Sequence, residues 1–441
     1  AIVPDVEQGV YPFKDVEPKL TRADIEWLLA AQEFGGMRGP VDWADEHQRG
    51  RDGLDLRGAW LRQADLSGLP LARMLGGLRR HERERATGEQ RAAAAIHLER
   101  ANLYDAHLED AVLSDAHLEG ARLGGTFGHR THLELAKLIE AHLEGADCSF
   151  AHLEGATLIG VHLDLAVLHR ADLERAELRE AQLGGATLTR AHLEGADLSG
   201  AVLGGADLRG CFFDSGTDLN DAAFFETKYG SVRLGDVRWG GANLALVRWS
   251  NRRQDQRNPV KAIVIGDEDV ARNPKNSDGT TKTSPQRLAD YENAVRANRQ
   301  LSKALRDQEL NDEADRFAYR ARVLERQVLR RQRDFPRLLV WYVLDVLAGY
   351  GYRTRRTFAA YLLAVFGFGI AYYGLSRAAG PALSPVGALV FSVTSFHGRG
   401  FFPGGLRLDD PLTVLAALEA FVGLIIEVSF IATFTQRFFA R

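Results

Sequence analysis

The stretch AHLEGADCSFAHLEGATLIG, residues 141–160, decides the fold of this chain. A small residue, usually Ala, stands two positions before a larger central residue, and the pair recurs every five residues. The series begins at Leu98 and Leu103 and runs without a slip to Phe213, which makes 24 consecutive units. Side chains repeat about every 3.6 residues on an α-helix and about every two on a strand, so neither explains the period. A coil that turns a corner every five residues does, with the small and the central residue both pointing inward.

Further units flank this main array. After a one-residue slip near Gly216 the expected central residues are Leu219, Phe224, Tyr229, Leu234, Trp239, Leu244 and Trp249. Four earlier units have their centres at Leu56, Leu61, Leu66 and Leu71. The sequence resembles the pentapeptide-repeat family, whose fold is a right-handed quadrilateral β-helix with four units per coil. The resemblance implies a solenoid over residues 51–250, interrupted at about 75–95, and residues 1–50 are expected to form an N-terminal helical cap.

The outer surface of the expected rod is acidic. Residues 97–250 have a net charge of about −11, whereas residues 251–360 have about +8. Some members of the pentapeptide-repeat family imitate duplex DNA and bind topoisomerase, so a DNA-mimic inhibitor is one alternative for function. A solvated acidic face that keeps the rod soluble explains the same charge. Inward positions Cys148 and Cys211 are expected to be packing residues.

Histidines recur just before the central leucine, at positions that should face outward. They are His107, His117, His132, His142, His152, His162 and His192. Residues twenty apart should lie on the same side, about 4.8 Å apart, which puts His132, His152, Asp172 and His192 in one column. Zinc needs ligands that converge to about 2 Å, so we expect no metal ion and no other cofactor here.

Three segments are expected between the rod and the first apolar span. Residues 251–284 are polar and rich in Pro, Gly and Asn, which is typical of a linker. Residues 285–334 have two helical stripes and should form a basic αα-hairpin, beginning at Ser284-Pro285. Residues 335–352 are expected to be an interfacial amphipathic helix. A basic block beside a membrane is more typical of attraction to anionic lipid than of nucleic-acid binding.

The last part of the chain predicts a hairpin of two transmembrane helices over residues 353–441. The spans are residues 357–375 and 411–435, and the first has no charged residue over its length. Arginines lie before the first span and after the second, so both termini and the repeat domain should be cytoplasmic, at the inner membrane. The apolar segment 385–395 is too short to cross and is typical of a re-entrant pore helix.

The segment after this short helix resembles the two-span tetrameric channels of the potassium-channel superfamily. The residues expected at the filter are Thr394, Ser395, Phe396, His397, Gly398, Arg399 and Gly400. They depart from the T-V-G-Y-G filter, so selectivity for potassium does not follow. Glu419, Gly423 and Glu427 share one stripe of the second span and are expected to line the pore. A lipid-facing carboxylate at mid-depth costs about 2.5–3.5 kcal/mol, so both glutamates should face a pore or a protein partner.

These observations favour a homo-oligomeric, tetrameric bacterial membrane channel, with permeating ions and lipid as its partners. The repeat domain would dock a protein partner or gate the pore. No nucleophilic triad, P-loop, zinc spacing or dinucleotide fingerprint is found, so we expect no enzyme and no nucleic-acid partner. A non-conducting, membrane-tethered interaction scaffold remains a second hypothesis, and the DNA-mimic inhibitor remains a third.

Overall fold

The structure is a computed structural model with two compact units, Ala1–Ala314 and Asp315–Arg441. The residues it describes are 8, 10–13, 20–34, 36–249, 264–276, 278–338, 342, 354–379, 382–398 and 410–438.

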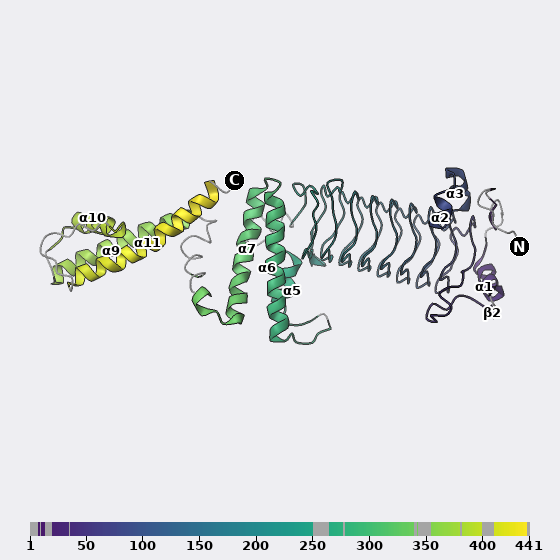
Figure 1. Ribbon diagram of the computed structural model, residues 1–441, viewed down its shortest axis with the longest axis horizontal. Helices are drawn as coiled ribbons and strands as arrows, with labels where there is room; N and C mark the ends of the chain where they lie inside the picture. The colour runs from purple at the N-terminus through teal and green to yellow at the C-terminus, as the bar shows by residue number, and fades with distance from the viewer. Residues whose placement is uncertain are drawn as a thin grey trace. The chain divides into compact units, whose positions relative to one another are not determined.

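Most of the first unit is a solenoid of stacked coils (Figure 1), and the twenty-residue spacing of its bridges gives each coil four five-residue sides. Parallel bridges join residues twenty apart, as His132 to His152 and His152 to Asp172. The amide of each central residue donates to a carbonyl on the next coil, as Leu153 does to Asp172 at 2.7 Å. The inward Ala and Leu positions are almost completely buried, and so is Cys148. The five-residue period therefore predicted the β-helix and the inward set correctly.

Each corner of a coil is a tight turn closed by the next inward residue. The Ala101 amide donates to the Leu98 carbonyl at 2.9 Å, and Arg100 between them has a φ of 57°. A positive φ at the third position is characteristic of a type II turn, which favours glycine. Glycine accordingly fills many equivalent corners, such as Gly145 and Gly155.

The early units stack directly on the main array. Trp60 bridges His97 and Asp65 bridges Asn102, each 37 residues along instead of twenty. A 17-residue insertion therefore leaves the rod and returns to it. It contains α2 (Arg80–Arg83) and α3 (Gly88–Ala94), within the interruption expected at about 75–95.

The N-terminal cap contains α1 (Arg22–Ala31), followed by the two-residue strands β1 (Glu33–Phe34) and β2 (Met37–Arg38). A reciprocal capping box between Thr21 and Asp24 starts α1. The Arg22 side chain donates to the Ser67 carbonyl at 3.0 Å, and Ile25 is completely buried. The cap thus packs on the first coil of the rod.

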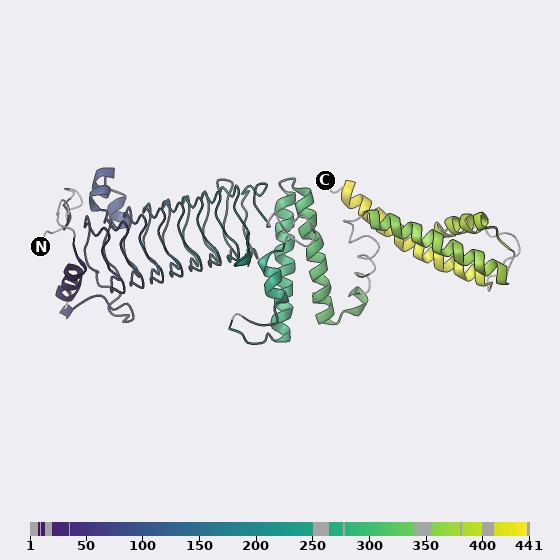
Figure 2. The ribbon, with the colours of Figure 1, turned by 180° about the vertical axis from the view of Figure 1, so that it is seen from behind.

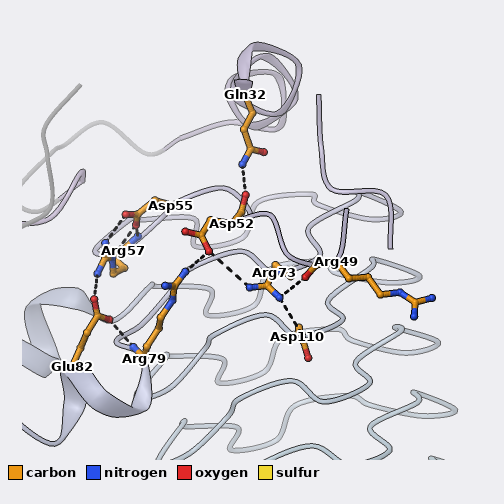
Figure 3. A network of polar contacts seen from close by, with 9 residues as sticks. All are labelled: Gln32, Arg49, Asp52, Asp55, Arg57, Arg73, Arg79, Glu82 and Asp110. Atoms are coloured by element: carbon orange, nitrogen blue, oxygen red, sulfur yellow. Dashed lines mark hydrogen bonds and ion pairs between the residues drawn. The ribbon is translucent and has the colours of Figure 1, made fainter. Parts of the chain in front are cut away.

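A polar network joins this cap to the insertion and the first coils (Figure 3). Gln32 at the end of α1 donates to the Asp52 carbonyl at 2.9 Å, and the Asp52 carboxylate pairs with Arg79. Glu82 of α2 accepts from the Arg79 amide and pairs with the buried Arg57 at 3.4 Å. Charged pairs therefore hold three segments together where the insertion interrupts the repeat.

One expected repeat unit near the other end of the rod is a hairpin instead. Strands β3 (Phe225–Glu226) and β4 (Gly230–Ser231) pair antiparallel, and Tyr229 lies between them. The Tyr229 ring does not point inward; a Cβ added at Gly184 would lie 2.3 Å from it. The assignment of Tyr229 as a central residue was wrong, because the hairpin folds back over glycines of an earlier coil.

Helix α5 (Gly266–Arg272) lies where a linker was expected. The Gly266 amide donates to Val232 at 2.7 Å, and the Asp267 carboxylate accepts from the Leu234 amide at 2.7 Å. These contacts tie α5 to the last coils of the rod. Residues 251–263 of the expected linker lie outside the described residues.

Helix α6 (Ser284–Arg306) also packs on the end of the solenoid (Figures 1 and 2). Its N-cap is Thr283, one residue before the expected Ser284, because Thr283 and Gln286 form the capping box. Gln300 exchanges hydrogen bonds with Asp236 of the rod. Together α5 and α6 cover a sheet edge that would otherwise pair with another chain.

The second unit is helical. It contains most of α7 (Asn311–Gln332), then α9 (Thr354–Ala379), α10 (Pro385–Phe396) and α11 (Pro411–Phe438). Segments 358–377 of α9 and 411–428 of α11 are long and apolar enough to cross a membrane. The shorter α10 begins at its N-cap Ser384 and packs against both. Of the interfacial helix expected at 335–352, residues 335–338 are helical, and most of the rest lies outside the described residues.

Candidate functional site

The polar stripe of α11 faces α10 of the same chain. Gly423 marks the closest approach, because a Cβ added there would lie 2.1 Å from the Phe396 carbonyl oxygen. Bare backbone at Gly423 lets the end of α10 rest directly on α11. On a single chain, the stripe therefore contacts α10 at Gly423.

Glu419 is enclosed within the helices of one chain. Its side chain is 0 % exposed, and the Ser392 hydroxyl of α10 donates to it. The Ser392 hydroxyl also lies 2.8 Å from the Val365 carbonyl of α9, so the cluster connects all three helices. The buried hydroxyl of Tyr372 lies close to Glu419 as well. A carboxyl group buried among apolar side chains is tolerated when it is hydrogen-bonded, so Glu419 has a structural partner without a pore.

Glu427 and His397 form the accessible end of the stripe. The imidazole Nδ1 of His397 and a carboxylate oxygen of Glu427 are in hydrogen-bond contact. Their side chains are 43 % and 40 % exposed, unlike that of Glu419. Of the three residues expected to line a pore, Glu427 is therefore the one that the structure leaves open on a single chain.

The expected filter residues lie at the end of α10. Thr394 donates to the Phe391 carbonyl at 2.9 Å, while Ser395 and Phe396 are buried. Helix α10 ends at Phe396 with His397 as its C-cap, and Gly398 follows with a φ of 65°, the conformation in which glycine commonly terminates a helix. Arg399 and Gly400 lie outside the described residues.

The outward faces of α9 and α11 are apolar. Exposed side chains on them are Phe358, Leu363, Phe366, Ile370, Val414, Leu418, Phe421, Leu424, Val428 and Ile431. A surface of this kind is stable against lipid or against further copies of the chain.

The sequence patterns did not identify Ser392 and Tyr372 as partners of the stripe. Ser392 is a polar residue within the otherwise apolar segment 385–395, and that was the available signal. A polar group inside an apolar helix usually has a specific partner. Which residue is the partner depends on how α10 packs.

Histidine and carboxylate side chains form a second polar arrangement, on the rod. The expected column of His132, His152, Asp172 and His192 is present, and the first two rings stack at 4.7 Å. Each histidine of a His-Leu-Glu unit also faces the glutamate two residues along. His152 Nδ1 lies 3.6 Å from Glu154 and 3.2 Å from Asp172. Hydrogen bonds to Asp172 and Glu154 raise the pKa of His152 to about 10.

Comparisons with known proteins concern the rod. The family model described as pentapeptide repeats (8 copies) matches residues 95–127, 146–181 and 176–214. No curated protein matches the chain.

Several solved structures are similar. HetL from the cyanobacterium Nostoc sp. strain PCC 7120, a pentapeptide repeat protein involved in heterocyst differentiation regulation, is 26% identical over 46% of this chain and 90% of that one, with a TM-score of 0.37. The pentapeptide repeat protein alr5209 from Nostoc PCC 7120 is 30% identical over 21% of this chain and 84% of its own, with a TM-score of 0.12. QnrB1, a plasmid-mediated fluoroquinolone resistance protein, is 20% identical over 38% of this chain and 95% of its own, with a TM-score of 0.22.

Proposed function

We propose that this chain, whose repeat region makes it a member of the pentapeptide-repeat family, is a subunit of an oligomeric bacterial membrane channel. Its β-helix would lie in the cytoplasm. Four subunits would each contribute α9, α10 and α11, and the rods would dock a partner or gate the pore. The proposal assigns no ion, because the segment at the end of α10 departs from the potassium filter.

The observation that carries this proposal is the packing of α10. A span needs about 20 apolar residues, and α10 has 12, so it is too short to cross. It nevertheless packs tightly against the two long apolar helices, with Tyr372 and Phe391 edge to face at 4.8 Å. A short apolar helix inserted between two spans is the arrangement of a re-entrant pore helix.

The proposed pore lies between subunits. The cluster around Glu419 fills the space between α9, α10 and α11 within one chain. The outward stripe of α11 is apolar, and the exposed His397–Glu427 pair is at the end of α10. Four copies arranged around an axis would bring four such pairs close to the path of an ion.

Electrical recording of the full chain tests the proposal. The protein is purified in detergent, its subunit number is measured by native mass spectrometry, and single-channel currents are recorded in planar bilayers under a salt gradient. We expect a tetramer with resolved openings. Glu427→Gln removes four negative charges and should shift the reversal potential away from cation preference. The control is Glu144→Gln, an exposed carboxylate on the rod, which should leave the currents unchanged.

A membrane-tethered scaffold is the second candidate, and the enclosure of Glu419 favours it. The Ser392 contact accounts for that carboxyl group without any permeation path. A monomer, or an oligomer that is silent in every salt tested, would replace the channel with the scaffold. Currents that are unchanged by Glu427→Gln would support a channel whose pore is lined by other residues.

A further inference from the structure

One outer face of the rod brings an imidazole and two carboxylates together. His152 and Glu154 belong to one coil, and Asp172 belongs to the next, directly beside His152. The ligating atoms of all three residues lie within 4.8 Å of one another. Each of the three side chains is about a third exposed, so a small solute can reach it while neighbouring residues hold it in place.

Two of the three distances within this cluster are close to those of a zinc site. His152 Nδ1 lies 3.6 Å from Glu154 Oε1 and 3.2 Å from Asp172 Oδ2. Zinc binds N and O ligands at about 2.0–2.2 Å with tetrahedral geometry, which places neighbouring ligand atoms about 3.3–3.5 Å apart. The column spacing of the backbone, about 4.8 Å, is therefore not the relevant distance, because side chains two residues apart converge.

A second observation concerns the carboxylate of Glu154. Its other oxygen, Oε2, is buried and has no hydrogen-bond partner. A buried carboxylate oxygen without a partner is costly, and a cation would remove this cost. The corresponding oxygen of Glu109 is also buried without a partner, so the second carboxylate, Asp172, is what distinguishes the site at His152. The same face continues with Glu174, His192 and Glu194, a further group of potential ligands.

We propose that His152, Glu154 and Asp172 bind a divalent transition-metal ion of the zinc class. Imidazole and carboxylate together suit zinc and its neighbours in the series better than calcium or magnesium, which prefer oxygen alone. Water would complete the coordination, because the site lies open on the surface of the rod. The proposal does not depend on channel activity, since it concerns the rod only.

Other histidines of the rod make comparison possible. His107 lies 2.9 Å from Glu109 in the same His-Leu-Glu unit, but Phe127 stacks on it from the next coil. His107 therefore has one neighbouring carboxylate, whereas His152 has two. At His97 the Glu99 carboxylate is already paired with Arg62 at 2.7 Å, which competes with a cation.

Zinc titration of the full chain in detergent micelles tests the site. The protein is treated with a chelator, which is then removed, and Zn²⁺ is titrated against a chromogenic competitor at neutral pH. We expect at least one tightly bound equivalent, with a proton released on binding, because the ion must displace the proton that Asp172 and Glu154 hold on His152. His152→Gln and Asp172→Asn should each weaken that equivalent tenfold or more, and His107→Gln, the matched control, should leave it unchanged.

Cobalt gives an independent readout, because Co²⁺ in a tetrahedral site absorbs strongly in the visible range. The band should appear with wild type and His107→Gln and be lost with His152→Gln. All three substitutions change outward side chains, and a thermal melt confirms that each variant is folded. Equal zinc affinity in wild type, His152→Gln and Asp172→Asn would overturn the proposal, as would wild type that binds no zinc.

Discussion

Pairs of residues one coil apart share the outer surface of the rod. Gly155 lies beside Leu135, and a Cβ added at Gly155 would meet that side chain at 2.7 Å. Gly185 lies beside Leu165 in the same way, at 2.9 Å. A glycine leaves room for the long side chain of the preceding coil, so the choice at one corner depends on the residue twenty positions earlier.

Glu134 shows how such neighbours change a pKa. Its side chain is 9 % exposed, the Ser114 hydroxyl of the preceding coil donates to it at 2.6 Å, and His132 contacts its other oxygen. Burial by itself would raise the pKa of Glu134, but hydrogen bonds from His132 and Ser114 outweigh it and lower the pKa to about 2.

A test of Glu134 follows from the sign of this shift. A lowered pKa means that the carboxylate stabilises the fold above its ordinary value of 4.5, and that this contribution is lost as pH falls through about 2. Glu134→Gln should therefore lower the free energy of unfolding of the rod at pH 7, by up to about 3 kcal/mol. The difference from wild type should shrink as the pH approaches 2. Urea unfolding monitored by circular dichroism measures both.

The exposed Glu140 provides the control for this experiment. Glu140→Gln should change the free energy of unfolding by less than about 0.5 kcal/mol at either pH. Equal effects of the two substitutions would mean that the contacts of Glu134 contribute nothing to stability.

The close approach of α10 to α11 is the feature that shapes the second unit. Gly423→Ala would place a methyl group 2.1 Å from the Phe396 carbonyl oxygen, so α10 must move away. We expect a lower melting temperature of the detergent-solubilised protein, measured by the fraction that stays monodisperse after heating, and altered currents if the channel proposal holds.

Gly367 in α9 is the matched control, because a Cβ there has nothing within 4 Å. Gly367→Ala should be neutral or slightly stabilising, since alanine is favoured over glycine in a helix by about 1 kcal/mol. If Gly423→Ala and Gly367→Ala have the same melting temperature, then α10 does not rest on α11 at Gly423.

The unit counted around Tyr229 shows where a repeat pattern misleads. Tyr229 falls on a central position by count, yet it lies in the β3–β4 hairpin and packs over Gly184. A five-residue count cannot distinguish a repeat unit from a five-residue excursion. The glycine pair Gly184-Gly185 was the visible signal that something covers that corner.

For the whole molecule, the charges beside the spans predict the topology. Arginines at Arg355, Arg356 and Arg437 should keep both ends of the hairpin in the cytoplasm. A cysteine in place of the exposed Ala382, between the spans, should then react with an impermeant maleimide on intact cells. One in place of the exposed Lys303 of α6 should react after permeabilisation only.

Background labelling should be low, because the native Cys148 and Cys211 are both buried. Labelling of Lys303→Cys on intact cells would reverse the assigned orientation. The experiment is independent of ion conduction, so it also applies to the scaffold alternative.

By itself the sequence determined those features that depend on local periodicity. A period of five specifies a coil with inward Ala and Leu, and long apolar segments specify helices suited to a bilayer. The short α10 and the common stripe of Glu419, Gly423 and Glu427 follow from the same kind of count.

Only the tertiary structure decided what each face meets. Helical spacing places Glu419 and Gly423 on one stripe, but packing determines that this stripe contacts Ser392 and Phe396. The cluster of His152 and Asp172 likewise requires one coil to lie on the next. The physical reason is that periodicity records which residues of a segment share a side, whereas burial, hydrogen bonding and ligand geometry depend on residues brought close from elsewhere in the chain.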